Sequence, residues 1–303
     1  MPLPQLKVTA AGRADQVLAG AVPGLSRRHA RELCRLGGVK LRGRLLRAAD
    51  PLAAGDTLAI DWSKLDTRSP EERERLAAKE QDIVALASGQ GWRALRKPAG
   101  LPSVAGFVDD ALNLAAMASA SFGGNASLPD GGLMHRLDND TSGACLFALT
   151  QEAYAAFLVQ RESHALSRRY LALVADGIAE RGEITWPLGH HPSDDSRMLA
   201  VKGDAVFRGE PQAARTVFEV QRRGDGAALI SLEIWGGRRH QIRAHLAALG
   251  FPVLGDPIYG VPSGRLGLHA ARLHFIDSGT RSEVVVEADP GAHFWNLAPV
   301  LRP

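Results

Sequence analysis

The sequence predicts a chain of mixed helices and strands in two unequal parts, and three observations support this. Residues 12–62 alternate short helical patterns with short aliphatic runs, which is typical of a small α/β unit. Residues 63–81 are rich in charge and almost free of large apolar side chains, which indicates a partly helical linker. From residue 82 to residue 303, apolar runs bounded by turn residues recur, as expected of a larger domain with buried strands. A length of 303 residues with 45% hydrophobic content is sufficient for such a core.

The first part is strongly basic. Residues 1–60 carry ten Lys and Arg against four Asp and Glu, a net charge of +6, whereas the remainder has a net charge of −3. A small basic segment on a near-neutral body is typical of an appendage that binds nucleic acid, and the alternative is a solvated basic face. Its predicted elements are a helix beginning near Asp15, a helix from Arg27 to Leu36 capped by Ser26 and ended by Gly37, and strands at Val39–Leu41 and Thr57–Ile60.

The second part shows a series of strand and helix patterns. A hairpin is predicted from Ile83–Leu86 and Trp92–Leu95, and the polar stretch His190–Gly209 reads as a loop. Further strands are predicted at Ala144–Leu149, Tyr170–Val174, Thr216–Val220 and Ala227–Ile234, and helices at Gln151–Ser163, capped by Thr150, and at Gln241–Leu249, stopped by Gly250.

The most informative stretch is His135–Gly143, which reads His-Arg-Leu-Asp-Asn-Asp-Thr-Ser-Gly. It gathers ionisable and hydroxyl side chains directly before the apolar run Ala144–Leu149. A polar loop that enters a buried strand holds its side chains at a fixed place, as a chemical site requires.

The amino-acid composition also indicates the cellular compartment in which the protein is expected. Cys34 and Cys145 lie in apolar patterns without metal-ligand spacing, so we expect buried core residues and no disulfide framework. The segment Met1–Leu6 lacks the apolar core of a signal peptide, and no apolar run is long enough to span a bilayer. We therefore expect a soluble cytoplasmic protein that does not bind a membrane.

Two other kinds of site are considered. A metal site is disfavoured because His240 and His245 are five residues apart, on different faces of a helix. A hydrolase using Ser142, His135 and Asp138 lacks the Gly-x-Ser-x-Gly elbow that exposes a nucleophilic serine. Ser142 is instead expected to bond to local backbone in a turn.

Taken with three further stretches, the central motif resembles the RluA-type pseudouridine synthase family. The resemblance covers residues 97–275. It is carried by His135–Gly143, by Arg168-Arg169-Tyr170 at a strand start, by Gly237–Arg243 followed by Gly255-Asp256 and Tyr259-Gly260, and by Leu268-His269-Ala270. Residues 12–62 are similar, more loosely, to the S-four RNA-binding domain. Two positions depart from the family pattern, since Arg168 stands where Lys is more usual and Gly236–Arg239 replaces Thr-Gly-Arg-Thr.

The resemblance implies a fold, a reaction and roles for individual residues. The fold is α+β, with a mixed, largely antiparallel catalytic sheet, helices outside it and an RNA cleft across it. The reaction is the isomerisation of uridine to pseudouridine in structured RNA, which requires no cofactor and no metal. Asp138 is the expected catalytic carboxylate, Tyr170 the ring that stacks on the flipped base and a candidate for proton transfer, and Arg243 the cation that holds Asp138.

RNA contacts are expected from cations in both parts. Arg136 beside the catalytic loop either contacts RNA or forms a structural ion pair with Asp140. The other expected contacts are Arg168 and Arg238 near the site, and Arg27, Arg28, Arg31, Arg35, Lys40, Arg42 and Arg44 in the first part. Large-subunit ribosomal RNA is the expected substrate. The alternatives are tRNA and a non-catalytic RNA-binding or ribosome-assembly factor. A monomer without a required protein partner is expected.

Overall fold

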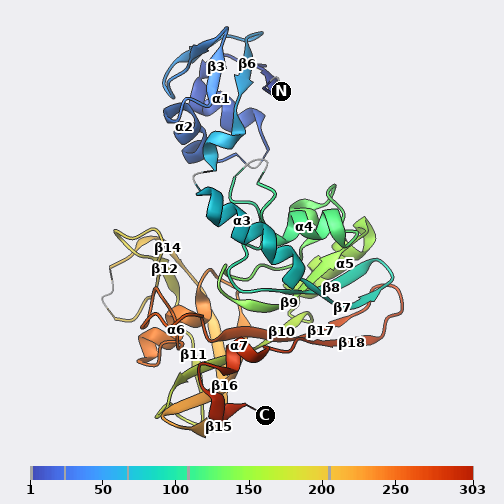
Figure 1. Ribbon diagram of the computed structural model, residues 1–303, viewed down its shortest axis with the longest axis vertical. Helices are drawn as coiled ribbons and strands as arrows, with labels where there is room; N and C mark the ends of the chain where they lie inside the picture. Colours follow the sequence, from blue (N-terminus) through green and yellow to red (C-terminus); the bar gives the residue numbers. More distant parts are fainter. Residues whose placement is uncertain (1–2, 24, 67, 108–109, 204–205, 303) are drawn as a thin grey trace.

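A computed structural model describes residues 3–23, 25–66, 68–107, 110–203 and 206–302. Met1 and Pro2, which begin the segment Met1–Leu6 considered above, lie outside these residues. The described chain is elongated, with the basic N-terminal part at one end of the long axis and a broad sheet at the other (Figure 1).

The N-terminal part folds as two helices against a small sheet. Its buried core contains side chains from Val8 to Leu65. Helix α2 begins after Ser26, whose side chain accepts a hydrogen bond from the His29 N–H, as expected of an N-cap. The sheet order is β1-β6-β3-β4, and β2 pairs with β5. The bounds are β1 Gln5–Lys7, β2 Gly12–Arg13, α1 Ala14–Ala21, α2 Arg27–Arg35, β3 Val39–Leu41, β4 Arg44–Leu45, β5 Pro51–Leu52 and β6 Thr57–Ile60.

The charged segment is largely helical. It contains the 3-10 turns η1 (Trp62–Leu65) and η2 (Lys79–Asp82) around α3 (Pro70–Ala78). Ser69 caps α3 by accepting from the Glu72 N–H, and Pro70 occupies the first helical position, where no N–H is needed. Arg68 ties this segment to the larger part, because it donates to Asp66 at 2.6 Å and to Asp110 at 2.7 Å.

The larger part is built on one nine-stranded sheet. Its order is β11-β15-β16-β10-β17-β9-β8-β7, with β18 also paired to β17. The pairing of β9 with β17 is parallel, and the other described pairs of this sheet are antiparallel. The expected α+β class with a mixed, largely antiparallel sheet is therefore confirmed. The strands are β7 Val84–Gly89, β8 Trp92–Lys97, β9 Ser142–Ala148, β10 Ser167–Ala175, β11 Arg181–Ile184, β15 Arg215–Gly224, β16 Ala227–Trp235, β17 Leu268–Ile276 and β18 Glu283–Glu287.

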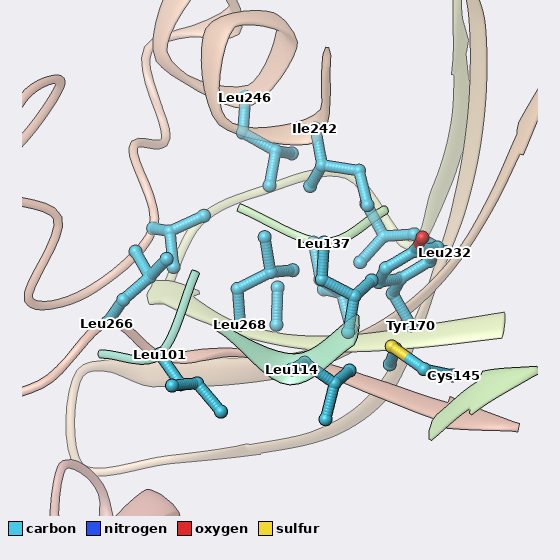
Figure 2. Packing of buried hydrophobic residues seen from close by; sticks show 14 of the residues in the cluster. Leu101, Leu114, Leu137, Cys145, Tyr170, Leu232, Ile242, Leu246, Leu266 and Leu268 are labelled. Atoms are coloured by element: carbon cyan, nitrogen blue, oxygen red, sulfur yellow. The ribbon is translucent and has the colours of Figure 1, made fainter. Parts of the chain in front are cut away.

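Helices cover this sheet and enclose its cores. They are α4 Leu114–Ser121, α5 Gln151–Glu162, α6 Gln241–Leu249 and α7 Ala292–Trp295, with 3-10 turns η3 Pro129–Gly132 and η4 Pro299–Leu301. Figure 2 shows Leu137, from the central motif, between Ile242 and Leu246 of α6 on one side and the sheet residues Tyr170 and Leu268 on the other. The residue before Asp138 is thus anchored in the main core.

One prediction about this part is wrong. The stretch His190–Gly209 is not simply a loop, because it contributes to a three-stranded sheet of order β13-β12-β14. These strands are β12 Leu188–His190, β13 Met198–Ala200 and β14 Arg208–Gln212. The strands have only three to five residues each, so no alternating apolar pattern marks them in the sequence.

Candidate active site

A small pocket lies where the central motif meets β10, the end of β16 and the start of α6. Its lining includes Asp138 and Tyr170, together with the cations Arg136, Arg168 and Arg238. Five of the residues singled out in the sequence therefore share one pocket, although they span a hundred positions of the chain.

The loop that carries Asp138 is held from both sides. The Ser103 hydroxyl donates to the Leu137 carbonyl at 2.6 Å and accepts from the Leu137 N–H at 3.0 Å. On the other side, the Gly100 N–H donates to the Asn139 carbonyl at 2.8 Å. The Thr141 N–H closes a turn onto the Asp138 carbonyl at 3.1 Å. These hydrogen bonds fix the backbone on both sides of Asp138 and so the direction in which its side chain leaves the loop.

Lys97 supports the same loop from inside the protein. The side chain is fully buried, and its Nζ donates to three carbonyls, of Leu101 at 2.6 Å, Asn139 at 2.8 Å and Pro98 at 3.1 Å. Burial lowers the pKa of Lys97 to about 8, but the three carbonyls match the three N–H bonds of an ammonium group. The sequence showed Lys97–Pro102 only as a turn-rich loop, so this support for Asp138 was missed.

Gly143 ends the motif because the sheet leaves no room for a side chain. Its φ is 127°, and a Cβ at this position would lie 2.2 Å from the Ala270 carbonyl oxygen of β17. This close approach is the parallel pairing of β9 with β17, in which Gly143 lies opposite Ala270. Glycine is therefore required where the loop that carries Asp138 enters the sheet.

Arg243 reaches Asp138 as expected, but a second carboxylate holds it more closely. Its Nη1 lies 3.5 Å from Asp138 Oδ2, whereas its Nε and Nη2 each donate to Asp256 at 2.8 Å. Arg243 and Asp256 are both buried, while the Asp138 side chain is 22% exposed at the pocket. Burial would lower the pKa of Arg243, but the hydrogen bonds and charge of Asp256 raise it, so this arginine stays charged.

Asp256 is in turn fixed by its own loop. Besides Arg243, its carboxylate accepts the N–H groups of Ile258 at 2.9 Å and Tyr259 at 3.1 Å. Burial alone would raise the pKa of Asp256, and these donors lower it instead. The Tyr259 hydroxyl extends the network to His240 Nδ1 at 3.0 Å. The sequence contained Gly255-Asp256 as part of a motif, but no spacing rule connects Asp256 with an arginine thirteen residues earlier.

Tyr170 lies beneath the pocket with 4% of its surface exposed. Burial raises the pKa of its phenol, so the hydroxyl stays protonated near neutral pH. Next to Tyr170, the pairing of β10 with β17 shifts register, and Ala271 is left as an extra residue opposite the step from Arg169 to Tyr170. Such a bulge redirects side chains, and it lies next to Tyr170, which lines the pocket together with Asp138.

The three cations at the pocket differ in how they are held. Arg238 donates from Nε to the Ala213 carbonyl at 3.2 Å. Arg168 lies against Gly237, whose φ of 57° and missing side chain leave room for its guanidinium. Arg136 is exposed, and within the described chain it forms no ion pair with Asp140 or another acid, so that alternative is wrong.

The cations of the N-terminal part do lie on exposed surface, but most have an acidic neighbour. Arg27 and Arg31 donate to Asp15, Arg35 pairs with Glu32, and Arg28 reaches Asp195 of the larger part at 3.4 Å. Arg42 and Arg44 lie 3.7 Å and 3.6 Å from Asp56 and Asp50. Lys40 is exposed on β3.

The hydrolase alternative is wrong, since its three residues are not assembled. The Ser142 hydroxyl is buried and contacts His269 Nδ1 at 2.7 Å and Arg265 Nη2 at 2.6 Å, rather than local backbone. His135 points elsewhere, with Nε2 accepting from the Leu146 N–H at 3.3 Å. Ser142 is therefore a structural residue at the start of β9.

Two further features of the described residues concern metals and membranes. Within them, no three His, Cys, Asp or Glu side chains gather closely enough to hold a metal ion. His240 bonds to Tyr259, and His245 bonds to the Thr216 hydroxyl and the Trp186 carbonyl.

No helix in the described chain has the length and apolarity that a membrane crossing needs. Cys34 and Cys145 are buried free thiols, and burial raises the pKa of both.

The pocket brings together one partly exposed carboxylate, a buried aromatic ring and several arginines. The sequence profile described as RNA pseudouridylate synthase matches residues 92–248, which include the whole of this pocket except Leu268. The chain belongs to the RluA-type family of RNA pseudouridine synthases, which isomerise uridine within RNA. A purely RNA-binding role is thereby set aside.

Individual relatives agree with this membership. An RNA pseudouridine synthase of Chloroflexus aurantiacus is 33% identical over 270 residues, which are 87% of this chain and 80% of the relative. Ribosomal large subunit pseudouridine synthase D of Xanthomonas campestris is 31% identical, over 97% of this chain and 90% of its own. Among solved structures, human RNA Pseudouridylate Synthase Domain Containing 1 shares the fold with a TM-score of 0.59 and 24% identity, covering 73% of this chain and 88% of its own.

Proposed function

We propose that this enzyme forms pseudouridine at defined uridines of large-subunit ribosomal RNA, with Asp138 as its catalytic group. The observation that carries the proposal is the position of the Asp138 carboxylate. It is 22% exposed at the pocket, while its neighbours Arg243 and Tyr170 are buried. The name of the Xanthomonas campestris relative supports the choice of ribosomal RNA.

The reaction requires a uracil base to leave its ribose, rotate and rejoin through ring carbon 5. An ionised carboxylate can start it by attacking the anomeric carbon or by assisting elimination from the sugar. Arg243 orients Asp138, and Asp256 positions Arg243. Both routes begin from the same Asp138 geometry.

The substrate base has to reach this pocket by leaving the RNA stack. Flipping costs a few kcal/mol, and stacking on an aromatic ring returns about 1–3 kcal/mol per base. Tyr170 supplies that ring, and its protonated hydroxyl is a candidate for the late proton transfer. Arg136 is exposed beside the loop and is suited to contact the position that the base vacates, while Arg168 and Arg238 face phosphates.

RNA beyond the target nucleotide is held by the N-terminal part. We assign it an S-four-like RNA-binding role, with phosphate contacts from the seven cations expected there, Arg27, Arg28, Arg31, Arg35, Lys40, Arg42 and Arg44. The unit of residues 12–62, the linker 63–81 and the catalytic domain 82–303 together form one RNA-binding enzyme. We further propose that it acts as a monomer in the cytoplasm.

The test is pseudouridine mapping of total RNA from cells that lack the protein, complemented with wild type or with Asp138→Asn. Ribosomal sites that disappear and return only with wild type support both the substrate and the role of Asp138. Sites restored equally by Asp138→Asn overturn the catalytic assignment. Loss confined to tRNA identifies tRNA as the substrate and overturns the ribosomal assignment.

A further inference from the structure

Asp15 is an unusual residue for the most basic region of the chain. It lies in the first turn of α1, is fully buried, and accepts hydrogen bonds from three arginines. The Nε atoms of Arg13, Arg27 and Arg31 lie 3.1, 3.1 and 2.9 Å from its carboxylate oxygens. Burial would raise the pKa of Asp15, but these three hydrogen bonds outweigh it and hold the pKa far below its ordinary value. Asp15 is therefore a permanent anion.

Each arginine of this trio uses only its Nε to reach Asp15. Within the described residues, their outer Nη groups have no hydrogen-bond partner, and the side chains are 48%, 47% and 55% exposed. One carboxylate thus holds three guanidinium groups so that their outer Nη groups face outward. The four side chains together have a net charge of +2. Fixing long side chains in advance removes the entropy that they would otherwise lose on binding an anion.

A series of contacts also links α2, which carries Arg27 and Arg31, to the candidate active site. Arg28, adjacent to Arg27 on α2, reaches Asp195 in the segment between β12 and β13. Asp195 also pairs with Arg208, and its carbonyl accepts from Arg239 at 2.9 Å. Arg239 is the neighbour of Arg238, which lines the pocket. Contacts through Asp195 therefore connect Arg28 of α2 with Arg239, which is adjacent to the pocket residue Arg238.

We propose that Asp15 organises a phosphate-binding site formed by Arg13, Arg27 and Arg31, whose ligand is the phosphodiester backbone of the substrate RNA. The proposal rests on the function proposed above and adds Asp15 and Arg13 to it. Guanidinium forks bind phosphate oxygens through paired N–H groups, and the free Nη groups of the trio provide them. Asp15 is a positioning residue that does not touch RNA.

The proposal predicts a change in RNA affinity that is opposite to the one expected from net charge alone. Asp15→Asn adds one positive charge to the protein, which by charge alone strengthens RNA binding. If Asp15 organises the trio, the variant instead binds RNA about tenfold more weakly, because the guanidinium groups are released. The measurement is the affinity of the full chain for a large-subunit ribosomal RNA transcript between about 50 and 200 mM salt. Binding as tight as wild type, by a variant with unchanged circular dichroism and melting temperature, overturns the proposal.

A second pair of variants tests the proposed phosphate-binding site if Asp15→Asn does not fold. Arg13→Gln and Arg47→Gln remove the same charge from the same part of the chain, but Arg47 is exposed and pairs with no acid among the described residues. Arg13→Gln should reduce the slope of log affinity against log salt by about one, and Arg47→Gln should leave it close to wild type. Equal effects of the two variants overturn the proposal while pseudouridine formation by wild type still stands. A wild-type protein that neither binds nor modifies RNA overturns the proposed function itself.

Discussion

Arg243 forms its two shortest contacts with Asp256, both at 2.8 Å, and reaches Asp138 at 3.5 Å. The guanidinium is thus fixed from behind by a buried carboxylate and presents its remaining nitrogen to the carboxylate at the pocket. Asp138 gains a cationic neighbour without a tight ion pair, so its oxygen atoms stay available to a substrate. The residue that fixes the arginine, Asp256, is thus distinct from Asp138, the carboxylate at the pocket.

The first prediction concerns Asp256. Asp256→Asn should lower kcat for pseudouridine formation by about 10–100-fold, with little change in KM for RNA, because Arg243 loses its orientation rather than a contact to RNA. The pH dependence of kcat should also shift, since the charge beside Asp138 is altered. A variant that melts early but keeps the kcat and pH profile of wild type would reduce Asp256 to a purely structural residue.

The roles of the Tyr170 ring and of its hydroxyl can be tested separately. Tyr170→Phe keeps the face on which a base stacks, so RNA affinity should be unchanged while turnover falls if the hydroxyl moves a proton. Tyr170→Leu should in addition weaken the binding of RNA by about 1–3 kcal/mol. Affinity and single-turnover rates of both variants make the comparison, and thermal melting shows whether the buried site tolerates each change. Full turnover by Tyr170→Phe would exclude the hydroxyl from proton transfer.

Lys97 is expected to matter for stability as much as for activity. Lys97→Met removes a buried cation that donates to three backbone carbonyls, and it should lower the free energy of unfolding by at least about 2 kcal/mol. Urea unfolding gives this value, and Lys64→Met, at an exposed position of η1, is the matched control. Wild-type stability of Lys97→Met would mean that the Asp138 loop does not depend on these hydrogen bonds.

Buried histidines should make the protein sensitive to mild acid. Burial lowers the pKa of His269 from 6.5 to about 4, so between these values the unfolded chain binds more protons than the folded one. Lowering the pH from 6.5 to 4 should therefore reduce the free energy of unfolding, with up to about 3 kcal/mol from this group.

The contribution of His269 can be isolated by substitution. His269→Gln should flatten this part of the stability profile, although His135 and His240, whose pKa values burial also lowers, keep some of the slope. The exposed His293 provides the control, since His293→Gln should leave the profile unchanged. A His269→Gln profile as steep as that of wild type would contradict the prediction.

Elements with strong local signals were predicted closely from sequence. The strands Val39–Leu41 and Thr57–Ile60 and the helix Gln241–Leu249 have the expected bounds. The caps at Ser26 and Thr150 are formed as expected. In each case the deciding interaction lies within a few residues of the chain, such as a side chain that accepts the N–H three positions later.

Features that depend on distant contacts were missed. Nothing near Lys97 in the sequence shows that it meets Asn139, forty-two residues later. The same holds for Ser142, whose partners His269 and Arg265 lie more than a hundred residues away. The assembly of the pocket likewise depends on strand order and register, which local patterns do not encode.

The parallel pairing of β9 with β17 has a consequence for the order of events during synthesis. β9 leaves the ribosome long before β17, and until then it can pair only with its antiparallel neighbour β8. Closing the sheet at Ser142 and His269 is a contact of high sequence separation, which forms slowly. The loop bearing Asp138 thus receives its final support only when nearly the whole chain has been made, so a C-terminally truncated chain that lacks β17 should fail to order this loop.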